Sequence, residues 1–306
     1  MALVTSKYIW RNGELIPWEQ ATTHILTHAL HYGTAVFEGI RCYKTDTGSA
    51  VFRLVEHMER LVRSASFIMM DLPYSARELS DATAELIRAN ELESCYVRPL
   101  AYRGYGSMGV NPRPAPIDVA IAVWPWNAYL GEEALEQGMH AGISSWRQRT
   151  ANSTPGVVKS SASYLNSGLA HIEALDHGYG EAILLNENGT VAEGSGENIF
   201  VVRNGALKTP PVSDGILEGI TRDSVMQLAR HFGYEVSEAS LVRTDLYGAD
   251  EVFFTGTAAE VTPIARIDYR TIGSGKRGPI TEKLQTAFFD VVAGRVPEFE
   301  SWLYRV

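Results

Sequence analysis

One lysine in the chain has neighbours that suit covalent chemistry. Lys159 follows Val157 and Val158 and precedes the four small residues of 160–163 (SSAS), which leave room for a bulky reactant. A lysine amine attacks carbonyl compounds in its neutral form. An ordinary lysine pKa of about 10.4 leaves about one amine in 2,500 neutral at pH 7, and burial lowers that pKa by roughly 3 to 5 units. The two valines could supply such burial, although most lysines are simply solvated.

Two later segments bring a carboxylate and a candidate phosphate site. Glu193 closes a predicted strand and opens EGSGENIF, residues 193–200. Residues 209–229 then run into an amphipathic helix whose first turn offers backbone N–H groups and the hydroxyl of Thr221. A helix N-terminus of this kind binds phosphate through its unpaired N–H groups and its macrodipole. The TGTAA segment, residues 255–259, follows another predicted strand and offers a second hydroxyl and exposed amides.

A lysine, a glutamate and a phosphate cradle together predict pyridoxal 5′-phosphate as the cofactor. In that chemistry Lys159 bonds to the cofactor aldehyde and later moves the proton between the substrate Cα and the cofactor. A carboxylate opposite the pyridine nitrogen keeps that nitrogen protonated, so the ring accepts electrons from the substrate. An ionised Glu193 fits this role. The alternative is that Glu193 is a residue at a hairpin edge that faces water.

The composition limits the class of protein. The 306 residues are 45% hydrophobic and 21% charged, with a net charge of −9, and this length allows two domains. An acidic chain without a basic stripe is a poor nucleic-acid binder. The two cysteines, Cys42 and Cys95, lie in apolar, strand-like runs, which is typical of a reducing compartment. No apolar run reaches membrane-spanning length, so we expect a soluble cytoplasmic protein without membrane or nucleic-acid partners.

Helical and strand periods alternate along the chain, as in α/β and α+β proteins. The helix at 75–90 begins with a capping box, Ser75 to Glu78, and the helix at 221–233 ends at Gly233. A turn-rich break predicts a smaller N-terminal domain at 1–123, a linker at 124–135 and a larger C-terminal domain with Lys159 at 136–306. A further helix is expected at 56–70, and strands are expected at 96–104, 118–126, 181–194, 198–210 and 251–264, with hairpin turns at 186–189 and 203–205.

Two further motifs point to functions that we do not expect. GYGSMG, residues 104–109, matches the dinucleotide-binding pattern, but the prolines of 110–116 exclude the helix that the pattern requires. His24, His28 and His31 have a spacing that could place three imidazoles on one helix face. No acidic or thiol ligand shares that spacing, so a half-buried segment with polar histidines is the better interpretation, and no metal is predicted.

The chain resembles the branched-chain-amino-acid aminotransferases among the class IV, fold-type IV pyridoxal-phosphate enzymes, over essentially its whole length. The signature region reads EGSGENIF at 193–200, then Thr209, then LEGITR at 217–222. Upstream, the segments at 28–43, 96–99 and 108–112 resemble the branched-chain subgroup. The resemblance implies an α+β or α/β two-domain fold of the D-amino-acid aminotransferase type, with the cofactor in the cleft between the domains. It also implies a homodimer or a higher homo-oligomer.

The resemblance implies roles for individual residues. Lys159 would be the catalytic lysine, Tyr164 would bond the cofactor's phenolic oxygen, Glu193 would pair with the pyridine nitrogen, and Leu217 would pack on the ring. The phosphate would be held by Arg60, Gly219, Ile220, Thr221, Gly256 and Thr257. From periodicity alone, Arg60 would be a solvated helix residue.

The implied activity is the reversible transfer of the amino group of L-leucine, L-isoleucine or L-valine to 2-oxoglutarate, giving 2-oxo acids and L-glutamate. One pocket must then hold an aliphatic side chain and a carboxylate in turn, and an apolar pocket rejects a carboxylate unless a cation can reach it. Arg98 would be that cation, and Ala258 and Ala259 would bind the α-carboxylate through their amides. The pocket would be completed by Tyr32, Phe37, Gly39, Tyr96, Met108, Val110, Trp126, Tyr129 and Gly196.

One segment departs from the family pattern. Where the family usually has Gly-Gly-Asn before the tyrosine, this chain has the SSAS of 160–163, and Ser163 replaces an amide that could order the loop. The spacing from Lys159 to Tyr164 is intact. Three alternatives remain at this point: a D-amino-acid or (R)-amine transaminase, a class IV aminodeoxychorismate-type lyase, and a protein that only binds the cofactor. The set of Tyr32, Phe37 and Arg98 favours the branched-chain enzyme over the D-amino-acid or (R)-amine transaminase. A lyase would not need the YGTAVFEGIR segment of 32–41, and a protein that only binds the cofactor would not need Lys159, Glu193 and Tyr164 together.

Overall fold

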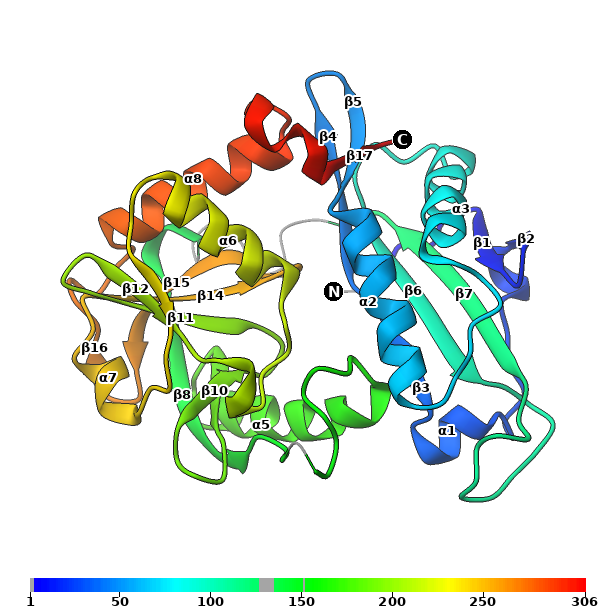
Figure 1. The fold of residues 1–306 in the computed structure, drawn as a ribbon, viewed down its shortest axis with the longest axis horizontal. Helices are drawn as coiled ribbons and strands as arrows, with labels where there is room; N and C mark the ends of the chain where they lie inside the picture. The colour runs from blue at the N-terminus through cyan, green and yellow to red at the C-terminus, as the bar shows by residue number, and fades with distance from the viewer. Residues whose placement is uncertain (1–2, 127–134, 151) are drawn as a thin grey trace. The chain divides into compact units, whose positions relative to one another are not determined.

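The chain forms two compact units of mixed α and β structure. The computed structural model describes residues 3–126, 135–150 and 152–306. Unit 1 consists of residues 1–127, 158–162 and 290–306, and unit 2 of residues 128–157 and 163–289 (Figure 1). The expected linker at 124–135 lies mostly outside the described residues, so the domain boundaries stay a prediction. The backbone contacts group two segments of the predicted C-terminal domain with unit 1: residues 158–162, which include Lys159, and residues 290–306.

Unit 1 is built on an antiparallel sheet. Within the described residues this sheet has eight strands, in the order β17-β5-β4-β6-β7-β1-β2, with β3 also paired to β6. The strands β6 and β7 are the long central pair, and their register places Tyr96 opposite Trp124 and Arg98 opposite Ala122. The bounds are β1 Tyr8–Arg11, β2 Glu14–Pro17, β3 Ala35–Phe37, β4 Ile40–Thr45, β5 Gly48–Phe52, β6 Cys95–Arg103, β7 Ile117–Trp124 and β17 Leu303–Arg305.

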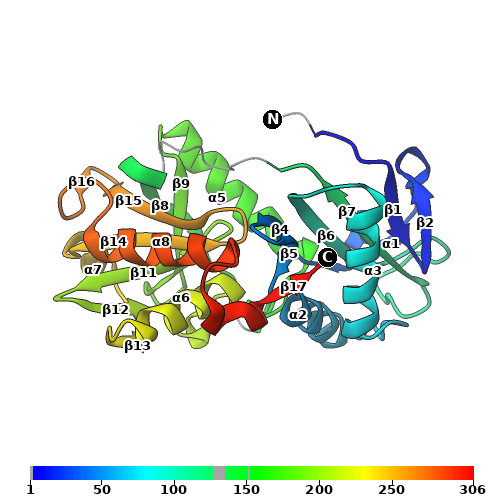
Figure 2. The same ribbon diagram turned by 90° about the horizontal axis from the view of Figure 1, so that it is seen from above.

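Two amphipathic helices, α2 (Leu54–Phe67) and α3 (Ala76–Ala89), cover one face of this sheet (Figure 2). The predicted capping box of α3 is confirmed, because Glu78 N–H donates to the Ser75 hydroxyl and Ser75 N–H to the Glu78 carboxylate. The helix α2 also buries polar side chains on its inner face. Unit 1 further contains the short helices η1 (Trp18–Gln20), α1 (His28–Tyr32) and η4 (Pro297–Trp302).

Unit 2 is built on a mixed sheet. In the part of the chain that the structure describes, the order is β10-β9-β8-β15-β14-β11-β12-β13, with β16 on β15. The pairs β8–β9, β8–β15 and β12–β13 are parallel. The bounds are β8 Met139–Arg147, β9 Glu181–Leu185, β10 Val191–Gly194, β11 Asn198–Arg203, β12 Ala206–Thr209, β13 Val236–Glu238, β14 Glu251–Gly256, β15 Glu260–Ile267 and β16 Arg270–Thr271.

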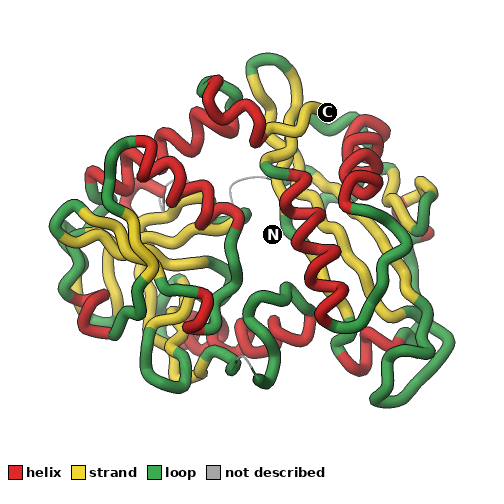
Figure 3. The backbone as a smooth tube through the Cα atoms, in the orientation of Figure 1, coloured by secondary structure: helices red, strands yellow, loops and turns green. Residues whose placement is uncertain are grey.

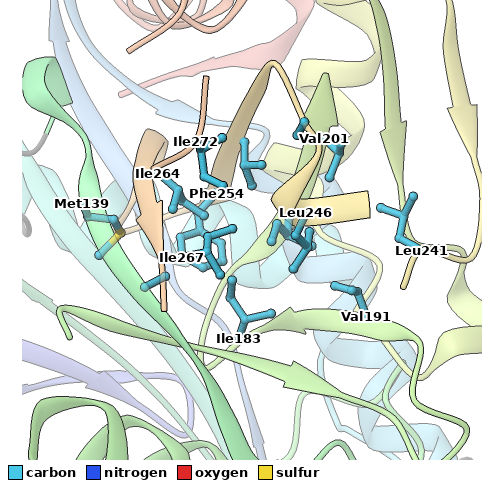
Figure 4. Packing of buried hydrophobic residues seen from close by; sticks show 14 of the residues in the cluster. Met139, Ile183, Val191, Val201, Leu241, Leu246, Phe254, Ile264, Ile267 and Ile272 are labelled. Atoms are coloured by element: carbon cyan, nitrogen blue, oxygen red, sulfur yellow. The ribbon is translucent and has the colours of Figure 1, made fainter. Parts of the chain in front are cut away.

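The core of unit 2 lies on these strands. Buried side chains from β9, β11, β14 and β15 pack with Leu246 and Ile272, as Figure 4 shows. Apolar burial of this kind is the main favourable term in folding. Unit 2 also contains the helices α5 Tyr164–Asp176, η3 Val212–Asp214, α6 Ile220–His231, α7 Arg243–Tyr247 and α8 Pro279–Val292. The last three residues of α8 group with unit 1. The short helix η2, Ser161–Ser163, has its first two residues in unit 1 and its last in unit 2.

The structure also tests the two rejected motifs. Residues 104–116, which comprise GYGSMG and the segment after it, form a loop (Figure 3), so the absence of a helix that the prolines predict is confirmed. The helix α1 contains His28 and His31 but not His24, because it covers only 28–32 and ends at Gly33, whose φ of 66° is left-handed. Among the described residues, no group of three or more His, Cys, Asp or Glu side chains could hold a metal, and no helix is long and apolar enough to cross a membrane.

Candidate active site

In unit 1, Lys159 lies on a short extended segment beside β3. Phe37 N–H donates to the Lys159 carbonyl at 3.1 Å, and Val36 forms an antiparallel bridge with Ser160. On the other side, Lys159 N–H donates to the Ser64 hydroxyl of α2 at 3.4 Å. The Lys159 amine lies 5.2 Å from the centre of the Phe37 ring. Two hydrogen bonds therefore hold the Lys159 backbone, and its amine lies beside an aromatic face.

Arg98 also lies beside Phe37, among several aromatic rings. Its guanidinium carbon is 4.9 Å from the Phe37 ring centre, 5.2 Å from Tyr96 and 5.9 Å from Trp124. One N–H of Arg98 donates to the Tyr96 hydroxyl at 3.3 Å, and Trp126 packs on Tyr96 with ring centres 4.7 Å apart. The buried Arg98 Nε has no hydrogen-bond partner among the described residues. The cation is therefore available to an acceptor from a ligand.

A glycine and a cavity lie next to the aromatic rings around Arg98. A Cβ on Gly39 would lie 2.0 Å from the Tyr96 hydroxyl oxygen, so a side chain at position 39 would displace that ring. A cavity of about 410 Å³ adjoins Arg98, with mostly apolar walls that include Ala35, Leu100 and Ala122. Of the other expected pocket residues, Tyr32, Met108 and Val110 are exposed, and Tyr129 lies outside the described residues.

Arg60 belongs to a buried cluster and is not the solvated residue that periodicity indicated. Its Nε and Nη2 donate to the two carboxylate oxygens of Glu38 at 2.6 and 2.8 Å, and His57 Nδ1 lies 2.8 Å from one of them. Burial by itself would raise the pKa of Glu38, but Arg60 and then His57 hold that pKa well below its usual value. Burial lowers the pKa of His57, against the effect of Glu38.

In unit 2, Glu193 is the acceptor at the centre of a network. One carboxylate oxygen accepts from Gln148 Nε2 at 2.5 Å, and the other accepts from Asn198 Nδ2 at 3.1 Å and from Leu217 N–H at 3.0 Å. Hydrogen bonds to the charged form of a carboxylate favour ionisation. The hairpin between β9 and β10 has a register shift at Val191/Glu193. The alternative of a glutamate that faces only water therefore does not hold.

The N-terminus of α6 packs directly against this network. Gly219 is the N-cap residue, and a Cβ there would lie 1.9 Å from the Asn198 amide oxygen, so this close approach requires glycine. Ile220 and Thr221 follow as the first, buried residues of the helix. Arg222 turns away, because its guanidinium donates to the Thr209 hydroxyl and to Pro210 O. Thr209 of the signature thus anchors α6 to β12.

The turn between β14 and β15 carries the other expected residues of unit 2. It comprises Thr257, Ala258 and Ala259 and follows Gly256, the last residue of β14. The Thr262 hydroxyl donates to Ala259 O at 2.6 Å. A Cβ on Gly256 would lie 3.6 Å from Gly196 O, so the turn and the loop after Glu193 are neighbours. Backbone amides with little side chain around them suit a phosphate or a carboxylate.

Tyr164 begins α5 and is partly exposed. Burial lowers the pKa of the neighbouring Arg149, and electrostatic interactions with Glu193 and Tyr164 raise it. Arg149 therefore lies near both residues. Arg149 Nη1 donates to Ser163 O, so a backbone contact orders the loop position where the family usually has asparagine. The buried Nε of Arg149 has no partner in the described ranges.

The sequence had predicted no role for several residues that contact these side chains. They are Gln148, Arg149 and Asn198 in unit 2, and Glu38, His57 and Trp124 in unit 1. Trp124 could have been found, since it stands two residues from Trp126 in a strand pattern and so faces the same side. Glu38 could also have been suspected, because a glutamate within the apolar run of 35–40 needs a buried partner.

Comparison with known proteins identifies the class to which this fold and these residues belong. The family described as amino-transferase class IV matches residues 35–267, and the chain belongs to this family. The branched-chain-amino-acid aminotransferase of Escherichia coli (strain K12) is 48% identical over 308 residues, which cover 100% of this chain and 99% of that protein. The expected fold class is confirmed.

Solved structures give the same result. A T.th. branched-chain amino acid aminotransferase with pyridoxamine 5′-phosphate has a TM-score of 0.96 and 50% identity, with 99% of each chain covered. The T.th. enzyme complexed with N-(5′-phosphopyridoxyl)-L-glutamate has a TM-score of 0.95 and 48% identity, again over 99% of each chain.

Proposed function

We propose that the protein is a pyridoxal-phosphate-dependent aminotransferase that transfers the amino group of L-leucine, L-isoleucine or L-valine to 2-oxoglutarate. The products are the branched-chain 2-oxo acids and L-glutamate. The support is the 48% identity with the Escherichia coli enzyme over 99% of that protein. The T.th. complexes with pyridoxamine phosphate and with a phosphopyridoxyl glutamate support the choice of cofactor.

The observation that carries the proposal is the set of three donors on Glu193. Side chains of Gln148 and Asn198 and the amide of Leu217 hold its carboxylate as an acceptor. Pyridoxal phosphate, when bound, supplies a protonated pyridine ring that withdraws electrons from the substrate Cα. A carboxylate that stays ionised is the partner such a nitrogen requires. Glu193 meets that requirement in this chain.

The other proposed cofactor residues each serve one part of the cofactor: the aldehyde, the ring or the phosphate. Lys159 would bond the cofactor and would carry the proton to and from the substrate Cα. Tyr164 would donate to the phenolic oxygen, and Leu217 would pack on the ring. Arg60, the start of α6 at Gly219, Ile220 and Thr221, and the pair Gly256 and Thr257 would donate hydrogen bonds to the phosphate. The donors at a helix N-terminus and a glycine-containing turn fit an anion of this kind.

The substrate residues must accept two chemically different side chains. Phe37, Tyr96 and Trp126 offer apolar surface to an aliphatic side chain. Arg98, which rests on aromatic faces and has an unpartnered Nε among the described residues, meets the distal carboxylate of glutamate. The amides of Ala258 and Ala259 bind the α-carboxylate, and Gly39 and Gly196 leave room. Tyr32, Met108, Val110 and Tyr129 complete the pocket.

We further propose a cytoplasmic homodimer or higher homo-oligomer. The support is the exposure of Leu30 and Tyr32 on α1 and of Met108 and Val110 on the loop after β6. Apolar side chains that form one exposed patch mark interaction surfaces, and Leu30 and Tyr32 share the short helix α1. The acidic composition, with a net charge of −9, supports a soluble protein.

A half-reaction tests the function. Purified protein loaded with pyridoxal phosphate is mixed with L-leucine and no oxo acid, while D-alanine and (R)-1-phenylethylamine are tested in parallel. We expect L-leucine to bleach the absorbance of the bound cofactor. Bleaching mainly by the D-amino acid or the amine would replace the substrate assignment, and absence of any cofactor absorbance would overturn the enzyme assignment. Release of pyruvate from an aminodeoxychorismate-type substrate would instead identify a lyase.

A further inference from the structure

A buried acid in unit 1 has no role in the function described so far. Glu38 is 0% exposed, His57 2% and Arg60 5%, and the three side chains contact one another. Burial of an ion pair removes both charges from water, and replacement by apolar residues is often neutral or stabilising. A buried Glu–His–Arg cluster is therefore weak evidence of a contribution to stability alone.

The cluster lies against the segment that carries Lys159. Glu38 directly follows Phe37, whose N–H bonds to the Lys159 carbonyl and whose ring lies near the Lys159 amine. On α2, Arg60 is one helical turn from Ser64, the residue that accepts the Lys159 N–H. The charge of Lys159 also contributes to the lowered pKa of His57, which reports the proximity of the two groups. The cluster is thus next to the reactive lysine both at the end of β3, through Glu38, and on α2, through Arg60.

The proton count of the cluster follows from its contacts. The lowered pKa of Glu38 makes it an ionised carboxylate, which can only accept hydrogen bonds. His57 must then carry its proton on Nδ1, and its own lowered pKa leaves the ring neutral. Arg60 is the cation. Glu38 fixes the plane of the guanidinium by a bidentate contact, the geometry that gives an arginine–carboxylate pair its directionality.

We propose that Glu38 is a positioning residue, which holds the Arg60 guanidinium in the orientation that binds the phosphate of the cofactor. His57 completes the arrangement by occupying the remaining side of the carboxylate. The inference rests on the proposed function, because it takes pyridoxal phosphate as the ligand of Arg60. It adds that the affinity for the phosphate depends on an acid that does not itself touch the phosphate.

The test compares two ligands that differ only in the phosphate. Apo protein is titrated with pyridoxal phosphate and with pyridoxal, and binding is followed by the absorbance of the bound ligand. In Glu38→Gln we expect Kd for pyridoxal phosphate to rise about 10- to 100-fold, the scale of a hydrogen bond to a charged group. Kd for pyridoxal should change by less than about threefold. A purely structural role would weaken both ligands alike.

Glu251→Gln is the matched control. Glu251 is also a buried carboxylate, but it belongs to unit 2 and accepts from the Ile280 and Thr281 N–H groups at the start of α8. In Glu251→Gln we expect Kd for pyridoxal phosphate and Kd for pyridoxal to change by the same factor, if they change at all. If Glu38→Gln does not fold, as judged by circular dichroism, Glu38→Asp keeps the charge on a shorter stem. The aspartate variant should show the same selective loss.

The outcomes separate the inference from the function. A selective loss of pyridoxal phosphate affinity in the Glu38 variants supports the inference. Equal weakening of both ligands, or no weakening, overturns it while the wild-type protein still binds the cofactor and transaminates. If the wild-type protein itself does not bind pyridoxal phosphate, the proposed function and the inference are both overturned.

Discussion

Phe37 and Lys159 contact each other twice, through the backbone hydrogen bond of 3.1 Å and through the 5.2 Å approach of the amine to the aromatic ring. The first contact fixes the register of the lysine segment against β3. The second places a cation over a π face, where the attraction is modest. Because the Arg98 guanidinium carbon also lies 4.9 Å from the Phe37 ring centre, one aromatic ring contacts both the Lys159 amine and the proposed carboxylate receptor.

The first prediction concerns Lys159. Lys159→Ala should abolish transamination between L-leucine and 2-oxoglutarate, because no other amine is proposed to bond the cofactor, and the protein should stay folded. Coupled measurement of glutamate formation and circular dichroism check both statements. Lys208→Ala, at an exposed lysine of β12, is the control and should keep full turnover. Full turnover by Lys159→Ala would refute the assignment.

The second prediction concerns substrate discrimination by Arg98. Arg98→Ala should raise KM for 2-oxoglutarate about 10- to 100-fold, the cost of a lost hydrogen bond to a charged group, and KM for L-leucine much less. The buried Nε of Arg98 has no acceptor among the described residues, so the substrate acid is its expected partner. Steady-state kinetics with each substrate varied provide the measurement, with exposed Arg113→Ala as control. Equal losses for both substrates would remove Arg98 from this role.

The third prediction concerns the charge of Glu193. Glu193→Gln puts an NH2 group in a position that now accepts a hydrogen bond, so at least one of the three donors loses its partner. The amide also cannot keep a pyridine nitrogen protonated. We expect kcat to fall about 10²-fold or more, with a shifted absorbance of the bound cofactor. Glu187→Gln, at an exposed turn, is the control, and an unchanged kcat in Glu193→Gln would contradict the mechanism.

The fourth prediction concerns acid stability. The pKa of His57 is lowered in the folded protein from an ordinary value of 6.5, so the unfolded chain takes up the proton first as pH falls. Stability from neutral His57 is therefore complete above about pH 6.5 and is lost below it, by up to about 1.4 kcal/mol per pH unit. His57→Gln keeps a donor for Glu38 but cannot titrate. Its free energy of unfolding should fall less steeply between about pH 6.5 and 5.

Urea denaturation at a series of pH values measures this slope. The control is His24→Gln, at an exposed histidine of the same unit, which should keep the wild-type slope. Identical slopes for wild type and His57→Gln would show that His57 is not buried in its neutral form.

The fifth prediction concerns close packing at Gly219. Gly219→Ala should displace the Asn198 side chain, which bonds to both Glu193 and Leu217 O, and should destabilise the protein by roughly 1–3 kcal/mol. Gly168→Ala is the control, since a Cβ there meets open space on α5 and should stabilise the helix by roughly 0.5–1 kcal/mol. Thermal unfolding measures both changes. A neutral Gly219→Ala would mean that Asn198 can move without loss.

Local signals in the sequence were sufficient for much of the fold. The helices α2, α3 and α6 follow from apolar periodicity, and the capping box at Ser75 and the glycine after α6 mark ends that depend on nearby residues alone. The parallel pairing of β8 with β15 could not be predicted, because the two strands are far apart in sequence and β8 (MHAGISSWR) mixes polar and apolar residues. The extent of α1 was also unpredictable from the histidine spacing.

The candidate site likewise contains residues that the sequence could predict and residues that it could not. Lys159 and Glu193 stand in segments whose residue types already indicate chemistry. The donors that hold Glu193 do not, since Gln148 is 45 residues away and is an ordinary glutamine beside two arginines. The same holds for Arg60, whose buried surroundings depend on the fold of Glu38 and α2 around it. Partners of a charged group are chosen by packing, which a linear pattern does not contain.

The path of the chain through its units has a consequence for biosynthesis. Unit 1 takes its last strand, β17, from residues 303–305 and its lysine segment from 158–162, while most of unit 2 is made in between. A ribosome therefore releases most of unit 1 long before the chain that completes its sheet exists. Strand β5 has an unpaired edge during that interval, and such edges attract other strands. The nascent protein is thus most exposed to aggregation while unit 2 is being translated, and chaperone occupancy should peak then.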